Sequence, residues 1–453
     1  MKKELTDCGK MLALKLFSDY EYHISIGLLL EHMLGQYPLR SIGGFYQFTG
    51  LHCASIFGLV EVLRALTKMD GVDINGMDET GATPLLWAAM SGHETVVKWL
   101  FRREDISPGG PDHSGRTPMS WAAGNGREGV VKLLLGRQDV NPNRPECRDQ
   151  TLISLAAQNR WEELRKLFLQ REDIDPDGPD KSGRTPISWA AGNGRGAVVK
   201  ILLERKDVNP NKPDYRDGTP ISWAAENGYE TVVKLLLTRK DVNPDRPVAW
   251  SKAPISLAAK NGHEAVVKLL LGRKEVNPDR ANYEDRTPIS LAAENGHDAV
   301  VKLLLGREDI NPDRPDRGGR TPLSWATKNG YEAVVGLLLG RKDVNPNRVE
   351  GWDTTPIAVA AENGHDAVVR LFLERKDINP DRPGKWDKTP ISLAAENGHE
   401  AVVKLLLGRK DVNPDQRGLW GRLPISLAAA NGHEAVVRLL LERKDGKPGR
   451  PDV

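Results

Sequence analysis

The chain has 453 residues, 28% of them charged, and its formal net charge is only +2. A charge this close to zero creates no large field, so we expect neither nucleic acid nor an anionic membrane as a partner. The three cysteines, Cys8, Cys53 and Cys147, lack the spacing of a metal or redox site, which indicates a reducing compartment.

Residues 1–48 form an N-terminal segment that differs from the rest. Its longest early apolar run, 24–30, is far too short to cross a bilayer, and no secretory apolar region follows Met1. We therefore expect a soluble protein in the cytoplasm, with the nucleus as the alternative. Apolar stretches at 11–17 and 24–34 predict two amphipathic helices. We interpret them as a cap on the open end of the array that follows, since a repeat array needs one.

From residue 49 to residue 453, the sequence is one segment copied every 34 residues. Most copies begin with Thr-Pro, as at Thr83-Pro84 and Thr389-Pro390. We number the places within a repeat from this Thr, which is place 1. A fixed period of this length indicates an array of stacked repeats. The 12 repeats start at residues 49, 83, 117, 151, 185, 219, 253, 287, 321, 355, 389 and 423.

Each repeat predicts two short helices and a long loop. Thr at place 1 is expected to cap the first helix, and Pro at place 2 suits the first helical turn. Asn-Gly at places 9 and 10 predicts the helix end, because this pair tolerates a left-handed backbone. The second helix follows, with the apolar stripe Val-Val-Lys-Leu-Leu-Leu and an Arg at place 21 near its end. Neither helix can bury its apolar side alone, so the fold class is all-α, a solenoid of helix-turn-helix repeats with hairpin-like loops.

The repeat that starts at residue 151 is the weakest copy. Leu152 replaces the Pro of place 2 and Arg160 replaces the Gly of place 10. A non-glycine residue in the left-handed region costs of order 1 kcal/mol. We therefore expect a soft point here, which Arg160→Gly would stabilise.

Several motifs recur in register, among them Thr83-Pro84-Leu85, Ala88-Ala89, Gly92-His93, Val96-Val97-Lys98, Asp139-Val140-Asn141 and residues 112–117. With these motifs, residues 45–453 resemble the ankyrin-repeat family. The resemblance implies a right-handed solenoid that binds other proteins through a concave face. Two departures are an Arg in place of the family's usual Gly before Asp411, and a repeat one residue longer than usual. The start at 50–59 also resembles ankyrin arrays that follow a NACHT domain in fungal proteins, in which case 1–48 would be the end of a connecting region.

No residue set predicts catalysis, a metal or a cofactor. His residues at place 11 should lie about 10 Å apart on neighbouring repeats, too far to share a zinc ion, and are interpreted as caps of the second helix. The Ser at place 4 is interpreted as a buried hydroxyl that bonds to the backbone. We therefore expect a non-enzymatic protein.

Two charged columns recur in the array. Arg at place 21 followed by an acid at place 23, as in Arg409 and Asp411, is interpreted as a solvated rim that neutralises itself. Arg or Lys at place 28, as in Arg314, is at most a weak candidate for binding anions.

The aromatic residues divide into two groups. Five Trp residues at place 5, such as Trp325, replace a Leu and are predicted to belong to the core. Four others occupy place 32, at the hairpin tip, with Tyr one place earlier in two repeats. Exposed aromatics at a regular place favour a partner surface; the alternative is that each Trp lies on the prolines of its own loop. With the Glu residues of place 8, the candidate partner-binding residues are Trp250, Trp352, Trp386, Trp420, Tyr215, Tyr283, Glu226, Glu294, Glu362 and Glu396.

These patterns predict a monomeric scaffold that binds another protein, in which a fixed frame carries variable hairpin tips. The resemblance implies that it is the ligand-sensing part of a NACHT-type recognition protein. The alternative is a structural spacer without a specific ligand. The identity of the partner stays open.

Overall fold

The computed structural model describes residues 48–69, 71–143, 152, 167–168, 171, 173–248, 252–349, 354–418 and 421–442. The chain divides by its internal contacts into an N-terminal body, Met1–Tyr215, and a C-terminal body, Arg216–Val453. Helices account for the regular structure of the described residues, apart from an isolated antiparallel bridge between Val248 and Lys252. The predicted cap at 1–48 and most of the repeat at 151–184, including Arg160, lie outside the described residues.

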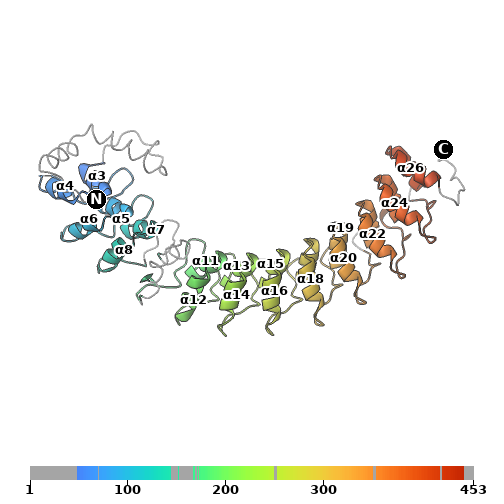
Figure 1. The fold of residues 1–453 in the computed structure, drawn as a ribbon, viewed down its shortest axis with the longest axis horizontal. Helices are drawn as coiled ribbons and strands as arrows, with labels where there is room; N and C mark the ends of the chain where they lie inside the picture. The colour runs from blue at the N-terminus through green and yellow to red at the C-terminus, as the bar shows by residue number, and fades with distance from the viewer. Residues whose placement is uncertain are drawn as a thin grey trace, which may run out of the picture. The chain divides into compact units, whose positions relative to one another are not determined.

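The N-terminal body contains helix pairs that follow the predicted period (Figure 1). Its described helices are α3 (Gly50–Phe57), α4 (Val60–Leu66), α5 (Pro84–Ser91), α6 (Glu94–Leu100), α7 (Pro118–Gly124), α8 (Glu128–Leu135), α11 (Pro186–Gly192) and α12 (Gly196–Glu204).

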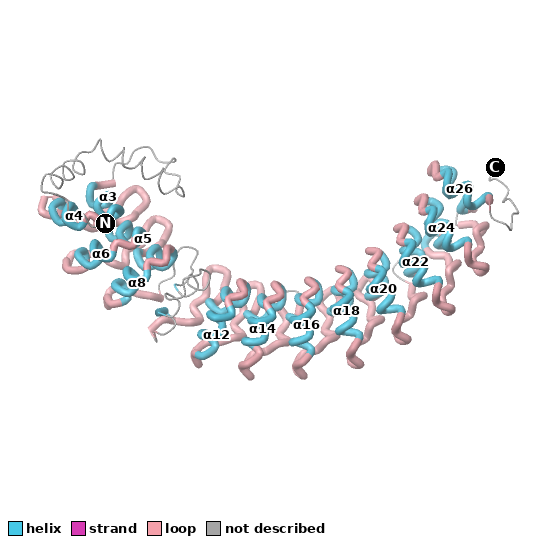
Figure 2. The backbone as a smooth tube through the Cα atoms, in the orientation of Figure 1, coloured by secondary structure: helices cyan, strands magenta, loops and turns pink. Residues whose placement is uncertain are grey.

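The C-terminal body continues the same pattern, with each helix pair beside the next and a loop extending from each junction (Figure 2). Its helices are α13 (Pro220–Glu226), α14 (Glu230–Leu236), α15 (Pro254–Lys260), α16 (Glu264–Leu271), α17 (Pro288–Glu294), α18 (Asp298–Leu305), α19 (Pro322–Lys328), α20 (Glu332–Leu339), α21 (Pro356–Glu362), α22 (Asp366–Leu373), η4 (Lys385–Asp387), α23 (Pro390–Glu396), α24 (Glu400–Leu407), α25 (Pro424–Ala430) and α26 (Glu434–Leu441).

The core lies between successive helix pairs. First helices pack on first helices and second helices on second helices, as α15 does on α17 and α16 on α18. Ile391, Ala394, Val403 and Leu406 are fully buried, with 0% of their surface exposed. These are the apolar places that recur in each repeat, so burial depends on having a neighbour on both sides.

The predicted cap of the first helix is confirmed. In all eight Thr-Pro repeats the Thr side chain accepts the N–H of the third helical residue, as Thr389 Oγ1 does from Ser392 at 3.3 Å. Such a cap contributes about 1 kcal/mol. The predicted environment of Ser at place 4 is also confirmed, because Ser120, Ser188, Ser222 and Ser392 are buried and the Ser222 hydroxyl donates to the Thr219 carbonyl at 2.8 Å.

The prediction that His at place 11 caps the second helix is wrong. His433 occupies the N-cap position but makes no side-chain cap bond. Its Nε2–H instead donates to the Glu396 carbonyl of the preceding repeat at 3.0 Å. The ring lies against Gly398, where an added Cβ would be 2.5 Å from Nδ1, and the φ of Gly398 is 74°. The left-handed glycine therefore leaves room for the histidine that joins two repeats.

The Arg at place 21 does more than form a solvated rim. The Arg409 guanidinium binds both carboxylate oxygens of Asp411 at 2.9 and 2.8 Å, as predicted for a self-neutralised pair. Its remaining nitrogen donates to the Leu373 carbonyl of the preceding repeat at 2.9 Å. A backbone carbonyl at a helix end needs a donor, so this Arg joins neighbouring repeats.

Candidate functional site

Where place 30 is Asp or Asn, its side chain organises the hairpin loop. In the loop before α19, Asp316 Oδ1 accepts the backbone N–H groups of Gly318 and Arg320 at 2.8 and 2.9 Å. The backbone N–H of Asp316 also donates to the Arg320 carbonyl at 2.9 Å. One carboxylate oxygen therefore closes the turn from inside and leaves the other oxygen for a second partner.

That second oxygen receives an indole from the following helix. Trp325 Nε1 donates to Asp316 Oδ2 at 3.0 Å, and Trp121 makes the same bond to Asp112 at 2.9 Å. The prediction that the Trp residues of place 5 belong to the core holds for Trp325, which is 6% exposed. It is wrong for Trp87, Trp121, Trp189 and Trp223, which are only partly buried. The indole N–H needs an acceptor, and the hairpin Asp provides it both for the buried Trp325 and for the partly exposed Trp121. Arg286 and Arg320 both lie over the ring of Trp325, which accounts for its deeper burial.

Arginines at place 34 stack on these rings. The guanidinium carbon of Arg116 lies 3.8 Å from the ring centre of Trp121. Trp325 has two such neighbours, Arg286 at 4.4 Å and Arg320 at 4.7 Å. Cation–π contacts of this kind contribute about 0.5–1 kcal/mol when exposed and more when desolvated.

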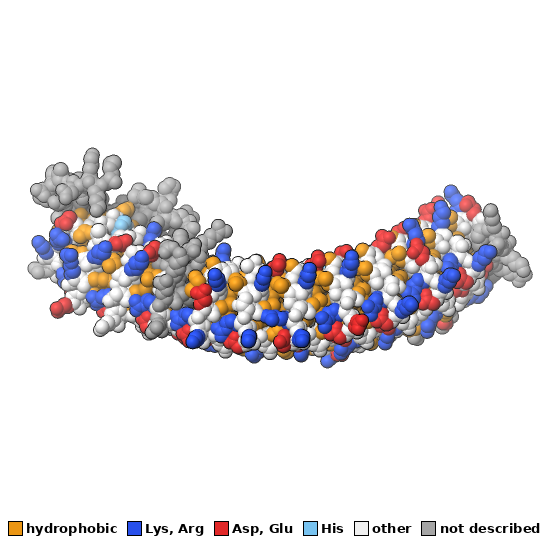
Figure 3. Space-filling view, turned by 60° about the horizontal axis from the view of Figure 1, so that its bottom comes forward, with side chains coloured by type: hydrophobic (Ala, Val, Ile, Leu, Met, Phe, Trp, Pro, Cys, Tyr) orange, Lys and Arg blue, Asp and Glu red, His pale blue; other side chains and the backbone are white. Residues whose placement is uncertain are grey.

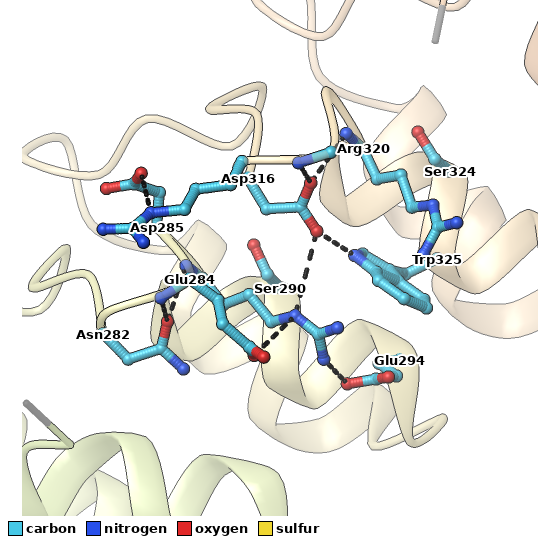
Figure 4. A network of polar contacts seen from close by, with 12 residues as sticks. Asn282, Glu284, Asp285, Ser290, Glu294, Asp316, Arg320, Ser324 and Trp325 are labelled. Atoms are coloured by element: carbon cyan, nitrogen blue, oxygen red, sulfur yellow. Dashed lines mark hydrogen bonds and ion pairs between the residues drawn. The ribbon is translucent and has the colours of Figure 1, made fainter. Parts of the chain in front are cut away.

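Figure 4 shows how these contacts extend to an acid of place 8. Arg286 forms ion pairs with Glu294 at 2.7 Å and with Glu284 at 3.3 Å. Its guanidinium also lies 3.8 Å from Asp316. The hairpin tip, the first helix and the next repeat therefore share one polar network around Trp325.

We call the surface formed by places 28–34 and by places 5 and 8 the hairpin face. The predicted Glu residues lie on it: Glu226, Glu294 and Glu396 are partly buried and Glu362 is exposed. Glu294 pairs with Arg286 and Glu396 with Lys388. Two of the four predicted carboxylates are thus already held by cations of the same chain.

The predicted tip aromatics are exposed where the structure describes them. Tyr215 is 78% exposed, Tyr283 41% and Trp386 52%. Trp250, Trp352 and Trp420 lie outside the described residues, so the row of four tip Trp residues stays a prediction.

Trp386 also has an unusual backbone. Its φ is 63° and that of Asp387 is 52°, whereas the hairpin of Asp316 has its left-handed residue at Gly319 alone. A positive φ at a bulky residue is an outlier, and backbone strain of this kind clusters at functional sites. The turn at 385–387 therefore keeps a large aromatic ring at the hairpin tip despite the strain of its left-handed backbone.

Several of the weak anion-binding candidates at place 28 are already paired. Arg348 binds Asp313 at 2.8 Å and Arg280 binds Asp245 at 2.6 Å, each acid belonging to the preceding repeat. Burial raises the pKa of Asp313, and the bond from Arg348 opposes that rise. Arg348 and Arg280 join repeats, which corrects the interpretation of these two residues as candidates for binding anions.

Sequence reasoning missed the Asp–Trp pair, although the printed sequence contains its signal. An Asp stands nine residues before every Trp of place 5, at Asp78, Asp112, Asp180, Asp214 and Asp316. Where place 5 is Leu or Val, the same position holds Glu146, Val248, Asn282, Glu350, Gly384 or Gly418. The two residues change together because the carboxylate accepts the hydrogen bond that the indole N–H must donate.

The described residues show no other chemistry that would point to a different kind of site. They contain no group of three or more His, Cys, Asp or Glu side chains placed to hold a metal ion. No helix among them is long and apolar enough to cross a membrane. Positive and negative side chains alternate along the C-terminal body (Figure 3).

Comparison with known proteins agrees with this architecture. The family model described as ankyrin repeats (3 copies) matches residues 15–116, 51–146, 121–214, 153–247, 255–350, 335–417 and 357–452. A search of curated proteins finds no match. Because the family matches cover most of the chain, the protein belongs to the ankyrin-repeat family.

Proposed function

We propose that the chain is a scaffold that binds another protein through its hairpin face. Ankyrin repeats are in general protein-interaction modules. The observation that carries the proposal is Trp386, which is 52% exposed while its backbone is left-handed at φ 63°. The fold does not need an aromatic at place 32, since other repeats have Ser114 or Gly318 there.

The chemistry of the hairpin face supports the same proposal. In the C-terminal body, the exposed rings of Tyr283 and Trp386 stand among charged groups of both signs; in the N-terminal body, Tyr215 is an exposed ring. An interface core rich in Tyr, Trp and Arg with a polar rim is typical of protein partners. The polar network around Trp325 provides a rigid base for the tips.

Affinity capture with matched variants tests the proposal. One variant carries Ala at Trp250, Trp352, Trp386 and Trp420, and the control carries Lys404→Ala on the exposed side of α24, away from the hairpins. We expect the control to retain the partners of the unaltered protein and the four-Trp variant to lose them. Identical partner sets for all three proteins would favour the structural spacer.

A narrower proposal is that this scaffold senses ligands for a NACHT-type recognition protein. Its support is the likeness at 50–59 alone. Co-purification of the array with a separate nucleotide-binding protein, dependent on residues 1–48, is the expected result, and an unaltered set of co-purified proteins without 1–48 would contradict it.

A further inference from the structure

A pocket of ≈ 270 Å³ opens on the hairpin face of the C-terminal body. It lies where the loop of the repeat starting at 355 meets the two repeats that follow. Its lining includes Trp386, Lys388, Glu396, Gly418, Arg422 and Leu427.

The pocket corresponds, three repeats later, to the network around Trp325. Lys388 takes the place of Arg286, Glu396 that of Glu294 and Arg422 that of Arg320. The two cations and the acid are therefore retained, and Lys388 still pairs with Glu396 as Arg286 does with Glu294.

Three groups of that network differ: Trp386 stands where Glu284 pairs with Arg286, and the two groups at the centre are also replaced. Gly418 stands where Asp316 provides the carboxylate, and Leu427 stands where Trp325 provides the indole. The hairpin still closes through its backbone, because the Gly418 N–H donates to the Arg422 carbonyl at 3.1 Å. The pocket thus lies at the position that corresponds to the Asp316 carboxylate and the Trp325 indole, with Leu427 forming part of its wall.

The size and charge of the pocket fit an aromatic residue from outside. An engineered cavity of about 150 Å³ holds benzene, so ≈ 270 Å³ accommodates an indole. Lys388, Arg422 and Glu396 leave one net positive charge at its wall. Since the carboxylate of Asp316 has no counterpart here, an acidic group beside the ring would restore the balance.

We propose that this pocket binds an aromatic side chain, preferably an indole, from an acidic segment of the partner protein. This inference rests on the proposed function and names what one part of the hairpin face recognises. The partner's ring lies between Lys388 and Arg422, as Trp325 lies between Arg286 and Arg320. The neighbouring carboxylate of the partner occupies the place of Asp316.

Fluorescence polarisation with a labelled peptide, Gly-Ser-Asp-Trp-Asp-Ser-Gly, tests the inference on the full chain. We expect saturable binding, and at least tenfold weaker binding when the Trp of the peptide is replaced by Ala or both Asp by Asn. Equal binding of the Ala peptide would overturn the inference, because it would show attraction by charge alone. If N-acetyltryptophan amide bound as tightly as the Asp-Trp-Asp peptide, the assignment to an acidic protein segment would be overturned.

A self-blocked variant locates the site. Gly418→Asp together with Leu427→Trp rebuilds the Asp–Trp pair inside the chain, and an added Cβ at residue 418 meets no atom closer than 3.4 Å. We expect this variant to melt no lower than the unaltered protein and to bind the peptide at least tenfold more weakly. Unchanged binding would overturn the inference.

A second variant covers the case in which the self-blocked protein does not fold. Arg422 is exposed, so Arg422→Gln should leave the melting curve unchanged and weaken peptide binding at least tenfold. Unchanged binding would again overturn the inference. The self-blocked variant keeps all four tip Trp residues, so its result is separate from the capture experiment. If peptides fail to bind while capture still depends on those residues, the pocket inference fails and the proposed function stands.

Discussion

The side chain at place 27 is one of those that join two neighbouring repeats. Asn347 donates its Nδ2 to the Asp377 carbonyl at 2.6 Å and accepts the Asn379 N–H at 3.1 Å. Asp381, at the same place in the next repeat, accepts the Asn413 N–H, but its Oδ1 is buried without a partner. Burial raises the pKa of Asp381, and the nearby Asp411 adds to the rise.

We therefore expect Asp381→Asn to stabilise the protein by about 1 kcal/mol, the net contribution of a typical hydrogen bond. The new Nδ2 would donate to the Asp411 carbonyl, as Asn347 does one repeat earlier. Chemical denaturation at pH 7 measures the change. The reverse substitution, Asn347→Asp, is the matched control and should destabilise; a stabilising Asn347→Asp would refute the explanation.

The pH dependence of this effect has a definite sign. The pKa of Asp381 is raised in the folded state, so protonation of this carboxyl adds to the free energy of unfolding. This added stability is lost as the pH rises through the raised pKa. The advantage of Asp381→Asn should therefore be largest at pH 7 and shrink as pH falls toward the unfolded pKa of about 3.9. The rim acids act oppositely: the bond from Arg409 lowers the pKa of Asp411, so its contribution is lost as pH falls.

At the scale of elements, the hairpin and the first helix form one unit through the Asp–Trp pair. Asn282 closes its turn as Asp316 does, with Oδ1 accepting Glu284 and Arg286 N–H groups at 2.9 and 3.0 Å. It is followed by Leu291, which needs no acceptor. In Asp316, one carboxylate oxygen therefore closes the turn, and the other accepts the hydrogen bond of the indole N–H.

Asp316→Asn should keep the turn but present an amide to the indole N–H of Trp325, which loses its acceptor. We expect a cost of about 1–3 kcal/mol for the unsatisfied buried group. Adding Trp325→Leu recreates the Asn282–Leu291 pair and should recover part of that cost. A double-mutant cycle measures the coupling, and a value indistinguishable from zero would show that the pair is not a unit.

The helices could be predicted from the sequence because their signals are local. Thr389 and Pro390 define a helix start, and Leu406 belongs to a stripe with helical period. The roles of His433 and Arg409 could not be predicted from the sequence, because their partners are backbone carbonyls of the preceding repeat, which no side-chain pattern reveals. The pocket was also missed: it follows from the absence of groups at Gly418 and Leu427, and an absence is visible only beside the intact network of Trp325.

For the whole molecule, the repeats depend on their neighbours, so stability should be lost in blocks. Leu406 is fully buried in α24, and Leu406→Ala should cost about 2–5 kcal/mol. We expect hydrogen exchange to show the repeats starting at 389 and 423 opening before those at the centre of the chain. Uniform loss of protection along the chain would contradict this account.

The central claim is that the exposed tip aromatics of the hairpin face bind a partner and are not required for the fold, and Trp386→Gly tests it most directly. Glycine has no penalty in the left-handed region, so the melting temperature should stay the same or rise slightly. A central interface Trp commonly contributes about 2 kcal/mol or more, which corresponds to about 30-fold in affinity. The measurement is the Kd of the captured partner for both proteins, beside their melting temperatures. We predict at least about 30-fold weaker binding without a lower melting temperature, and an unchanged Kd or a melting temperature lowered by several degrees would contradict the claim.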